Sequence, residues 1–320
     1  MTDRRDQCGM LAMLIGDGRP VLAFVGLALM LCGSFALFQS ATGDFLPHDV
    51  NYLGLTPKQL CGMHQCRVVH FMFHDRVAFG GALIALGLVY VWLAEVPLRS
   101  GESWAWWAIA VSGILGFASF FTCLGYGYFD LWHGVATVLV LAGFIVGLTR
   151  SRSAAWPWPA WKLFNRSNEY RGRLPLLLTA FGLCLGGLTI CIVGATCVFV
   201  PQDLNFMGVT ASELHAINPR LVPLIAHDRA SFGGVLMSCG VAWLFCVWCG
   251  KPSRSLWHVL CGSGAIGFAS AIGVHLIVGY IDFVHLGPAM LGSALFVVGI
   301  WLSFEPMCST PKSVVKEIAQ

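Results

Sequence analysis

Charged side chains are scarce in this sequence. Only 11% of the 320 residues are Asp, Glu, Lys or Arg, against about 25% in soluble globular proteins. The formal net charge is only +3, so the chain has no basic field that could hold a nucleic acid. Apolar side chains make up 57% of the residues, which excludes an intrinsically disordered chain. The composition therefore indicates an integral membrane protein surrounded by lipids.

Long apolar runs recur along the whole chain. A transmembrane helix needs about 20 predominantly apolar residues. Eight stretches meet this requirement: 21–40, 70–94, 104–123, 129–149, 175–199, 227–249, 257–279 and 284–304. The sequence thus predicts an all-α integral membrane protein with eight transmembrane helices.

The positions of Lys and Arg predict the orientation of these helices. With the N-terminus inside, 14 of the 19 basic residues fall in the inner connections, as the positive-inside rule requires. We therefore expect a multi-pass protein of the cell inner membrane with both termini in the cytoplasm.

The two halves of the chain resemble each other. HDRVAFGG (74–81) and HDRASFGG (227–234) agree at six of eight positions, and SGILGFAS (112–119) and SGAIGFAS (263–270) do so as well. The segments 45–56 and 127–133 also have counterparts, at 199–210 and 279–285. Four matches in the same order indicate an internal duplication. We expect two tandem, parallel four-helix repeats at 1–149 and 175–306. A cytoplasmic linker at 150–174, with interfacial tryptophans at 156, 158 and 161, joins them, and a cytoplasmic tail follows at 307–320.

Histidines occur at matching places in the two repeats. His74 and His133 lie about one turn into the second and fourth predicted spans, and His227 and His285 repeat this placement. The second and fourth helices of an up-down bundle face each other diagonally, so each pair could ligate a haem iron. Interhelical hydrogen bonding is the alternative role. His275 has no counterpart in the first repeat and is expected to be structural.

Charged residues accompany these histidines. Acidic residues close to the histidines are candidates for catalysis or for orienting a ligating ring: Asp75, Asp130, Asp228 and Asp282. The guanidinium groups of Arg76 and Arg229 could bind haem propionates. A simple Arg–Asp ion pair at the membrane surface is the competing interpretation.

The outer segments carry further polar residues. Asp49 and Asp203 lie in matching segments, and Thr56 and Thr210 begin sequences typical of a capping box. We expect short helices there that cover the outer mouth of each repeat. A substrate role for the two aspartates is the alternative.

Two cysteines, Cys61 and Cys66, share the first outer loop. An outer loop of a bacterial inner membrane protein is exposed to oxidising conditions. A structural disulfide and a dithiol that exchanges electrons are both compatible with the spacing.

Taken together, these features resemble the haem A synthase family. That family has eight spans in two four-helix repeats, a histidine pair on the second and fourth helices of each repeat, and a cysteine pair in the first outer loop. The matching positions here are His74 with His133, His227 with His285, and Cys61 with Cys66. The family has a glutamate three residues before its His-Arg, where this chain has Phe71, and Asp75 separates His74 from Arg76.

The leading hypothesis is a haem-binding membrane oxidoreductase or electron-transfer protein. It would bind one or two haems of b-type or a related type near the outer face, and exchange electrons with a quinone or another redox protein. A small-molecule transporter built from two parallel repeats is the first alternative. A metal-dependent membrane hydrolase that uses His74, Asp75, Asp130 and His133 is the second.

Overall fold

All regular secondary structure in the described part of the chain is helical. The computed structural model describes residues 15–64, 66–121, 128, 131–159 and 171–309, and within these ranges it contains no strand. The side chains of His64 and His133 are outside this description. Asp130 and Trp161 also lie outside the described residues.

Eight long helices lie where the sequence predicts spans. They are α2 (Arg19–Thr42), α5 (Arg67–Glu95), α6 (Ser103–Phe120), α7 (Leu131–Arg150), α8 (Arg173–Ala195), α11 (Leu221–Cys249), α12 (Arg254–Val278) and α13 (Phe283–Cys308). Seven of them are long and apolar enough to cross a membrane, whereas α7 has a shorter apolar stretch, 134–150. The chain is therefore a helical, multi-pass membrane protein.

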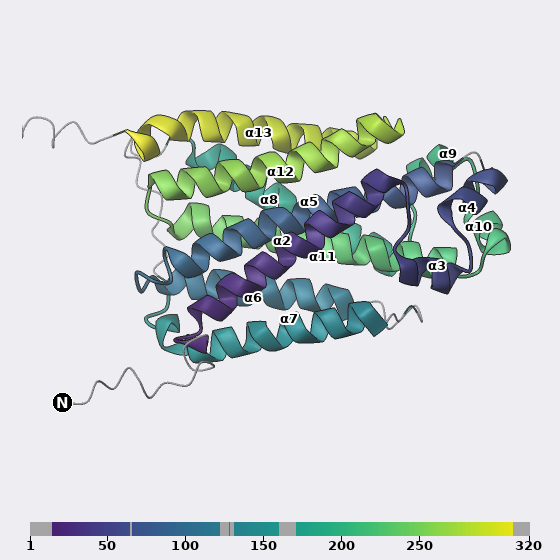
Figure 1. Cartoon of the computed structure of the whole chain (residues 1–320). Coiled ribbons are helices and arrows are strands. Elements are labelled where there is room, and N and C mark those ends of the chain that lie inside the picture. The colour runs from purple at the N-terminus through teal and green to yellow at the C-terminus, as the bar shows by residue number, and fades with distance from the viewer. Residues whose placement is uncertain (1–14, 65, 122–127, 129–130, 160–170, 310–320) are drawn as a thin grey trace, which may run out of the picture.

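Four short helices gather at one end of the long ones. These are α3 (Pro47–Leu53), α4 (Pro57–His64), α9 (Pro201–Met207) and α10 (Ala211–Ile217), on the right in Figure 1. The beginning of α2 and the end of α13 lie at the opposite end (Figure 1). A single-turn 3-10 helix (Arg152–Ala155) follows α7. In the linker after it, Trp158 packs on Trp107 of α6, with ring centroids 4.3 Å apart.

The two longest helices, α5 and α11, form the centre of the molecule. Two thirds of the apolar window of α5 and 61% of that of α11 are buried, against 28% or less for α2, α8, α12 and α13. Small residues allow α2 to approach α5: a Cβ added to Gly80 would lie 2.9 Å from the Gly33 carbonyl oxygen. On the other side, a Cβ on Gly240 of α11 would lie 2.6 Å from the Cys184 nitrogen of α8. Close backbone contact at glycine is typical of helix packing in membranes.

Helices of the first half also pack on helices of the second. α5 contacts α12, and α11 contacts α6. Gly81 of α5 faces Ser270 of α12, and Gly234 of α11 faces Ser119 of α6. Ser238 of α11 donates to the Ser112 carbonyl of α6 at 2.8 Å. The two groups of helices are therefore interleaved, and the glycines at 81 and 234 serve close helix contact.

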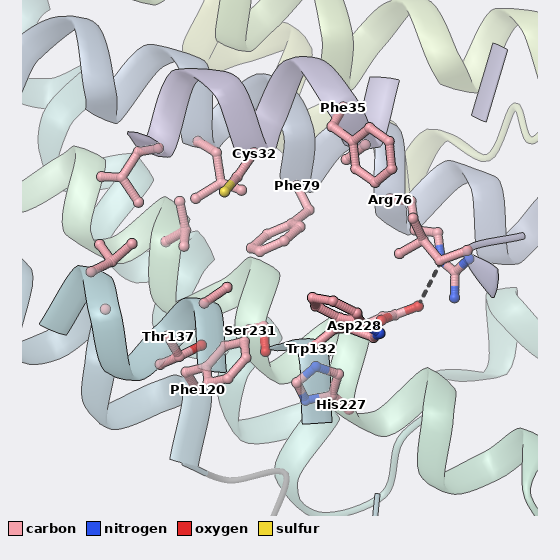
Figure 2. Close-up of a pocket in the computed structure, with 18 of the residues that line it drawn as sticks. Cys32, Phe35, Arg76, Phe79, Phe120, Trp132, Thr137, His227, Asp228 and Ser231 are labelled. Atoms are coloured by element: carbon pink, nitrogen blue, oxygen red, sulfur yellow. Dashed lines mark hydrogen bonds and ion pairs between the residues drawn. The ribbon is translucent and has the colours of Figure 1, made fainter. Parts of the chain in front are cut away.

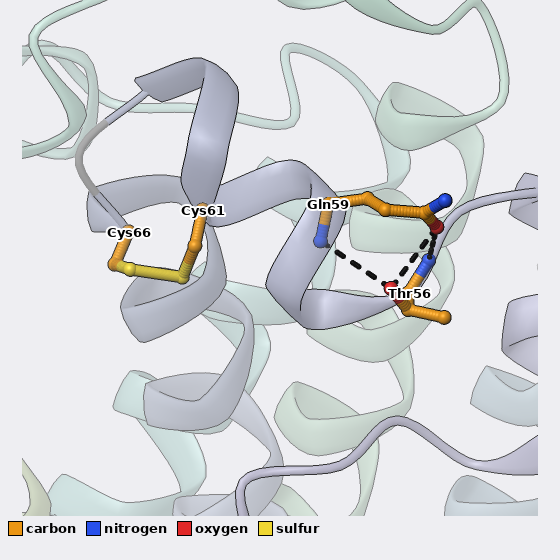
Figure 3. Close-up of a disulfide and its surroundings, with 4 residues drawn as sticks. All are labelled: Thr56, Gln59, Cys61 and Cys66. Carbon is orange, nitrogen blue, oxygen red and sulfur yellow. Dashed lines mark hydrogen bonds between the residues drawn. A yellow bond between two sulfur atoms is a disulfide. The ribbon is translucent and has the colours of Figure 1, made fainter.

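The expected capping boxes are confirmed. The Thr56 N–H donates to the side chain of Gln59 at 2.8 Å, and the Gln59 N–H donates back to Thr56 Oγ1 at 3.3 Å, at the start of α4 (Figure 3). Thr210 and Glu213 make the same reciprocal bonds at the start of α10. In the structure Cys61 and Cys66 form a disulfide, which ties the end of α4 to the start of α5 (Figure 3).

Candidate functional site

A buried network of charged side chains lies beside the short helices. We call it the carboxylate–arginine network; its members are Asp49, Asp75, Arg76, Asp203, Asp228 and Arg229. The Arg76 guanidinium on α5 contacts Asp49 of α3 at 2.9 Å and Asp228 of α11 at 3.0 Å. It also lies 5.3 Å from the ring centroid of Phe45. Arg76 thus joins the short helix α3 to the central helix α11.

Arg229 on α11 makes the corresponding contacts. Its Nε lies 3.3 Å from Asp75 of α5, and its Nη atoms bond both oxygens of Asp203 on α9, with Nη2 at 3.2 Å. It also donates to the Val198 carbonyl at 2.7 Å and lies 5.1 Å from the Phe71 ring centroid. The bidentate geometry is the one that guanidinium and carboxylate groups favour.

Two tyrosines complete the network, and the sequence reasoning missed both. The Tyr128 hydroxyl donates to Asp49 Oδ1, and the Tyr280 hydroxyl donates to Asp203 Oδ1, each at 2.8 Å. Burial and the adjacent carboxylates raise the pKa of both phenols above the usual value, so both remain hydrogen-bond donors at neutral pH. The sequence does contain a signal for them, because both tyrosines lie in duplicated segments that begin with Gly-Tyr, 127–133 and 279–285.

The network carries an excess of negative charge. Asp49, Asp75, Asp203 and Arg229 are less than 5% exposed, and Arg76 is 8% exposed. Counted at their formal charges, two guanidinium groups and four carboxylates sum to −2. Buried charge is costly unless it is compensated, so the network favours a cation in its neighbourhood.

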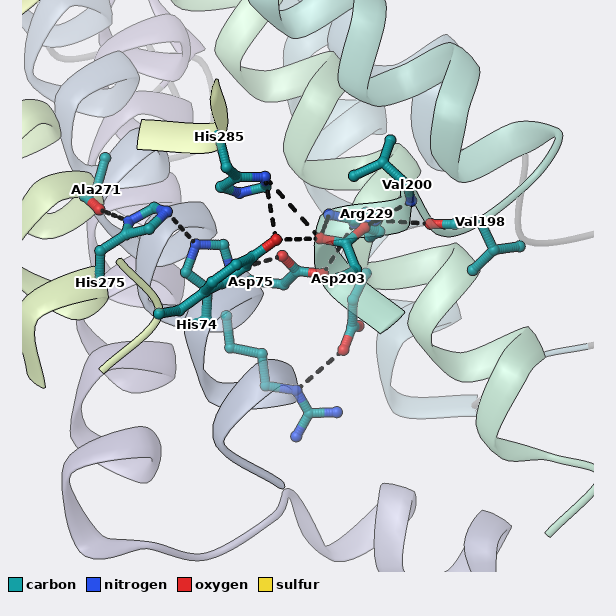
Figure 4. Close-up of polar contacts among 12 residues, drawn as sticks. His74, Asp75, Val198, Val200, Asp203, Arg229, Ala271, His275 and His285 are labelled. Carbon is teal, nitrogen blue, oxygen red and sulfur yellow. Dashed lines mark hydrogen bonds and ion pairs between the residues drawn. The ribbon is translucent and has the colours of Figure 1, made fainter. Parts of the chain in front are cut away.

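Next to this network lies a cluster of three histidines. His74 of α5 places its Nε2 3.0 Å from Nε2 of His275 on α12. The ring of His285 on α13 has its centroid 5.6 Å from that of His74 and 5.3 Å from that of His275 (Figure 4). Sequence reasoning paired His285 with His227 of its own half, but its ring contacts His74 of the first half together with His275 and Tyr280 of the second. It also assigned His275 a structural role, since no repeat marks that position.

His227 lies in a different environment. Its ring is 4.8 Å from Tyr128 and 5.2 Å from Phe120, measured between centroids. It lines a cavity of about 1240 Å³ between α2, α5, α6, α7 and α11 (Figure 2). Trp132 of α7 lines the same cavity. The next residue, His133, has a side chain outside the described part of the structure.

The aspartate before His285 has a local role. Asp282 is the N-cap of α13, and its carboxylate accepts the His285 backbone N–H at 2.9 Å. A capping carboxylate satisfies one of the free N–H groups at a helix start. Its first-half counterpart, Asp130, lies outside the described residues.

The two histidine environments differ in how they fit a haem. Opposite axial ligands of one iron have their nitrogens about 4 Å apart, because each metal–imidazole bond is about 2 Å long. The 3.0 Å contact between His74 and His275 is too short for such a pair. The cavity beside His227 fits a haem better, because its walls are largely apolar and two arginines, Arg76 and Arg220, line it.

No protein family, curated protein or solved structure matches this chain. The functional argument therefore depends on the site itself.

Proposed function

We propose that the protein is a membrane oxidoreductase or electron-transfer protein that binds a haem in the cavity between α2, α5, α6, α7 and α11. The observation that carries the proposal is the position of His227, an imidazole on the wall of a large, mainly apolar cavity. Neutral imidazole is a common axial ligand of haem iron. A volume of about 1240 Å³ exceeds the 300–1,000 Å³ typical of small-molecule pockets, so it can hold a macrocycle.

Polar groups at one part of the cavity suit the carboxylate edge of a haem. Arg76 and Arg220 both line the cavity. Arg76 is already paired with Asp49 and Asp228. Arg220 donates to the Tyr52 carbonyl at 2.6 Å, and the described residues include no carboxylate within ion-pair distance of it. We assign Arg220 to a haem propionate, since a guanidinium binds carboxylates through two parallel hydrogen bonds.

In this proposal, His133 is the second residue that would hold the haem, as an imidazole ligand; its side chain lies outside the described part of the structure. His133 follows Trp132, a cavity residue, on α7. Ligation by one histidine from α7 and one from α11 would use residues of both halves. This pairing matches the contact of His285 with His74, in which α13 and α5 also belong to different halves.

A bound haem would supply one-electron chemistry at its iron. The chain's own part is to hold the ring between apolar walls, to bind its carboxylates and to exclude water. A quinone or another redox protein is the proposed electron partner, and the disulfide between Cys61 and Cys66 is a further group that could exchange electrons. We therefore propose a function similar to that of the haem A synthases.

We further propose that the fold consists of two tandem parallel repeats with eight spans, in the cell inner membrane, with both termini cytoplasmic. Support comes from matching contacts in the two halves. Arg76 with Asp49 corresponds to Arg229 with Asp203, and Tyr128 corresponds to Tyr280. The distribution of Lys and Arg supports the orientation.

The visible spectrum of the purified protein tests the haem proposal. We expect a Soret band from protein made in haem-replete cells, and its loss or displacement in His227→Ala. His258→Ala is the matched control, because His258 packs on Trp257 near the start of α12, and should keep the band. A protein without a Soret band, or a His227→Ala variant with an unchanged spectrum, would contradict the proposal. Saturable solute uptake by a protein without a chromophore would favour the transporter instead.

A further inference from the structure

We propose that His74, His275 and His285 together bind a single transition-metal ion, at a site separate from the haem cavity. One ring nitrogen of each histidine lies within 4.8 Å of the others. The three residues come from three different helices, α5, α12 and α13. His74 is 3% exposed and His275 6% exposed, so two of the three rings are withdrawn from solvent.

Each of the three rings has a hydrogen-bond partner at Nδ1 (Figure 4). For His74 the partner is the Asp75 carboxylate at 3.0 Å. For His275 it is the Ala271 carbonyl oxygen at 2.6 Å. A carboxylate and a carbonyl only accept hydrogen bonds, so both histidines must carry their proton on Nδ1.

The third ring follows the same rule through Tyr280. The Tyr280 hydroxyl has one proton, which it donates to Asp203 at 2.8 Å. Its oxygen therefore accepts from His285 Nδ1, which lies 3.3 Å away. His285 is consequently protonated on Nδ1 as well, and its Nε2 remains for a ligand.

When all three rings are in the neutral form, this arrangement leaves their Nε2 atoms without protons. Nε2 of His74 and Nε2 of His275 nevertheless lie 3.0 Å apart. Two lone pairs at that distance repel each other unless a proton or a metal ion lies between them, and the proposal is that a metal ion does. Metal–imidazole bonds of about 2.0–2.1 Å put two ligand nitrogens about 3 Å apart at a right angle and about 3.4 Å apart at a tetrahedral angle. The observed distance suits neighbouring ligands of one small metal ion.

The surroundings also resemble those of known metal sites. Metal-bound histidines usually donate their other ring N–H to a carboxylate, a carbonyl or another oxygen, and all three do so here. Imidazole ligands suit zinc and copper, and three histidines leave a fourth position open for water or a substrate. The adjacent network has a formal charge of −2, which a divalent cation would neutralise. We assign the site to Zn²⁺ or Cu²⁺.

Within the described residues, this is the one cluster of three such ligands, and it combines His74 of the first half with two histidines of the second. The first-half position that aligns with His275 is close to Cys123, which is outside the described residues. We therefore expect one metal ion per chain.

Metal content of the purified full-length protein tests the proposal. The protein in detergent is treated with a chelator, equilibrated with Zn²⁺ and separated from excess metal. Its zinc content is then measured by elemental mass spectrometry. We expect one zinc per chain in the wild type. His275→Gln and His285→Gln should each weaken zinc binding at least tenfold. Asp75→Asn keeps the His74 ring but alters the group that its Nδ1 contacts, so zinc binding should weaken 10–100-fold.

His227→Gln is the matched control, since His227 corresponds to His74 in the duplicated HDR segment and lies outside the cluster. It should bind zinc as the wild type does. Loading with Cu²⁺ provides a second readout, because electron paramagnetic resonance should show coupling to imidazole nitrogens that His275→Gln reduces. A folded wild type with less than 0.1 zinc per chain would overturn the proposal. The short contact between His74 and His275 would then be explained by a proton shared between the two rings. Unchanged affinity in His275→Gln would overturn it too. The Soret band of the same samples reports on the haem cavity independently.

Discussion

Asp203 should be among the most important side chains for stability, although it lies on a seven-residue surface helix. Its carboxylate is fully buried and accepts bonds from Arg229, from the Tyr280 hydroxyl and from the Val200 backbone N–H. Asp203→Ala removes all of these acceptors at once. The change leaves a buried guanidinium with only one carboxylate partner, Asp75.

The expected loss can be estimated from these contacts. Removing one member of a buried ion pair costs about 3–5 kcal/mol, and the lower end applies because Arg229 retains Asp75. The Tyr280 hydroxyl loses an acceptor, which costs about 1 kcal/mol more. The total is about 4 kcal/mol. For a protein of this size, about 2 °C of Tm corresponds to 1 kcal/mol, so the Tm should fall by about 8 °C.

Thermal unfolding in detergent is the assay, and Asp282→Ala is the control. Asp282 belongs to the same half, and its carboxylate accepts one backbone N–H as the N-cap of α13, so its loss should cost about 1 kcal/mol, or about 2 °C. Asp203→Asn, which keeps the size of the side chain, should fall between the two. Equal shifts in Asp203→Ala and Asp282→Ala would refute the view that Asp203 anchors a buried network.

Two further perturbations test other parts of the fold. Gly234→Leu should lower stability by more than 2 kcal/mol and weaken the contact of α11 with Ser119, whereas Gly182→Leu, which projects into open space, should change the Tm by less than 1 °C. Reduction of the disulfide, or replacement of Cys61 and Cys66 by serine, should lower stability by about 2 kcal/mol, the chain-entropy value for so short a loop. We expect faster proteolysis near α4, with unchanged cleavage elsewhere. Equal cleavage rates with and without the disulfide would contradict this prediction.

Local features of the fold could be predicted from the sequence. The helix positions follow from apolar runs of sufficient length, because a bilayer imposes that length. The starts of α4 and α10 follow from capping boxes at Thr56 and Thr210, since the bonding partners lie only three residues away. Such signals are contained in a few neighbouring residues, and packing elsewhere does not alter them.

The composition of the site could not be predicted in the same way. Duplication pointed to His74, His227 and His285, but it could not show which helices become neighbours. The sequence reasoning kept each repeat as a separate bundle, whereas α5 packs on α12 and α11 packs on α6. His275 was assigned a structural role because it breaks the symmetry, and duplication was the criterion used to select residues. Tertiary contacts between distant segments decide both points.

The interleaving has a physical cause in the HDR segments themselves. Adjacent residues on a helix point about 100° apart, so Asp75 cannot face Arg76 on its own helix. Each aspartate instead meets the arginine of the other segment, Asp75 with Arg229 and Asp228 with Arg76. One half alone would therefore bury a carboxylate and a guanidinium without these partners, at a cost of several kcal/mol. These reciprocal contacts join α5 to α11, in the manner of a two-fold interface between two similar units.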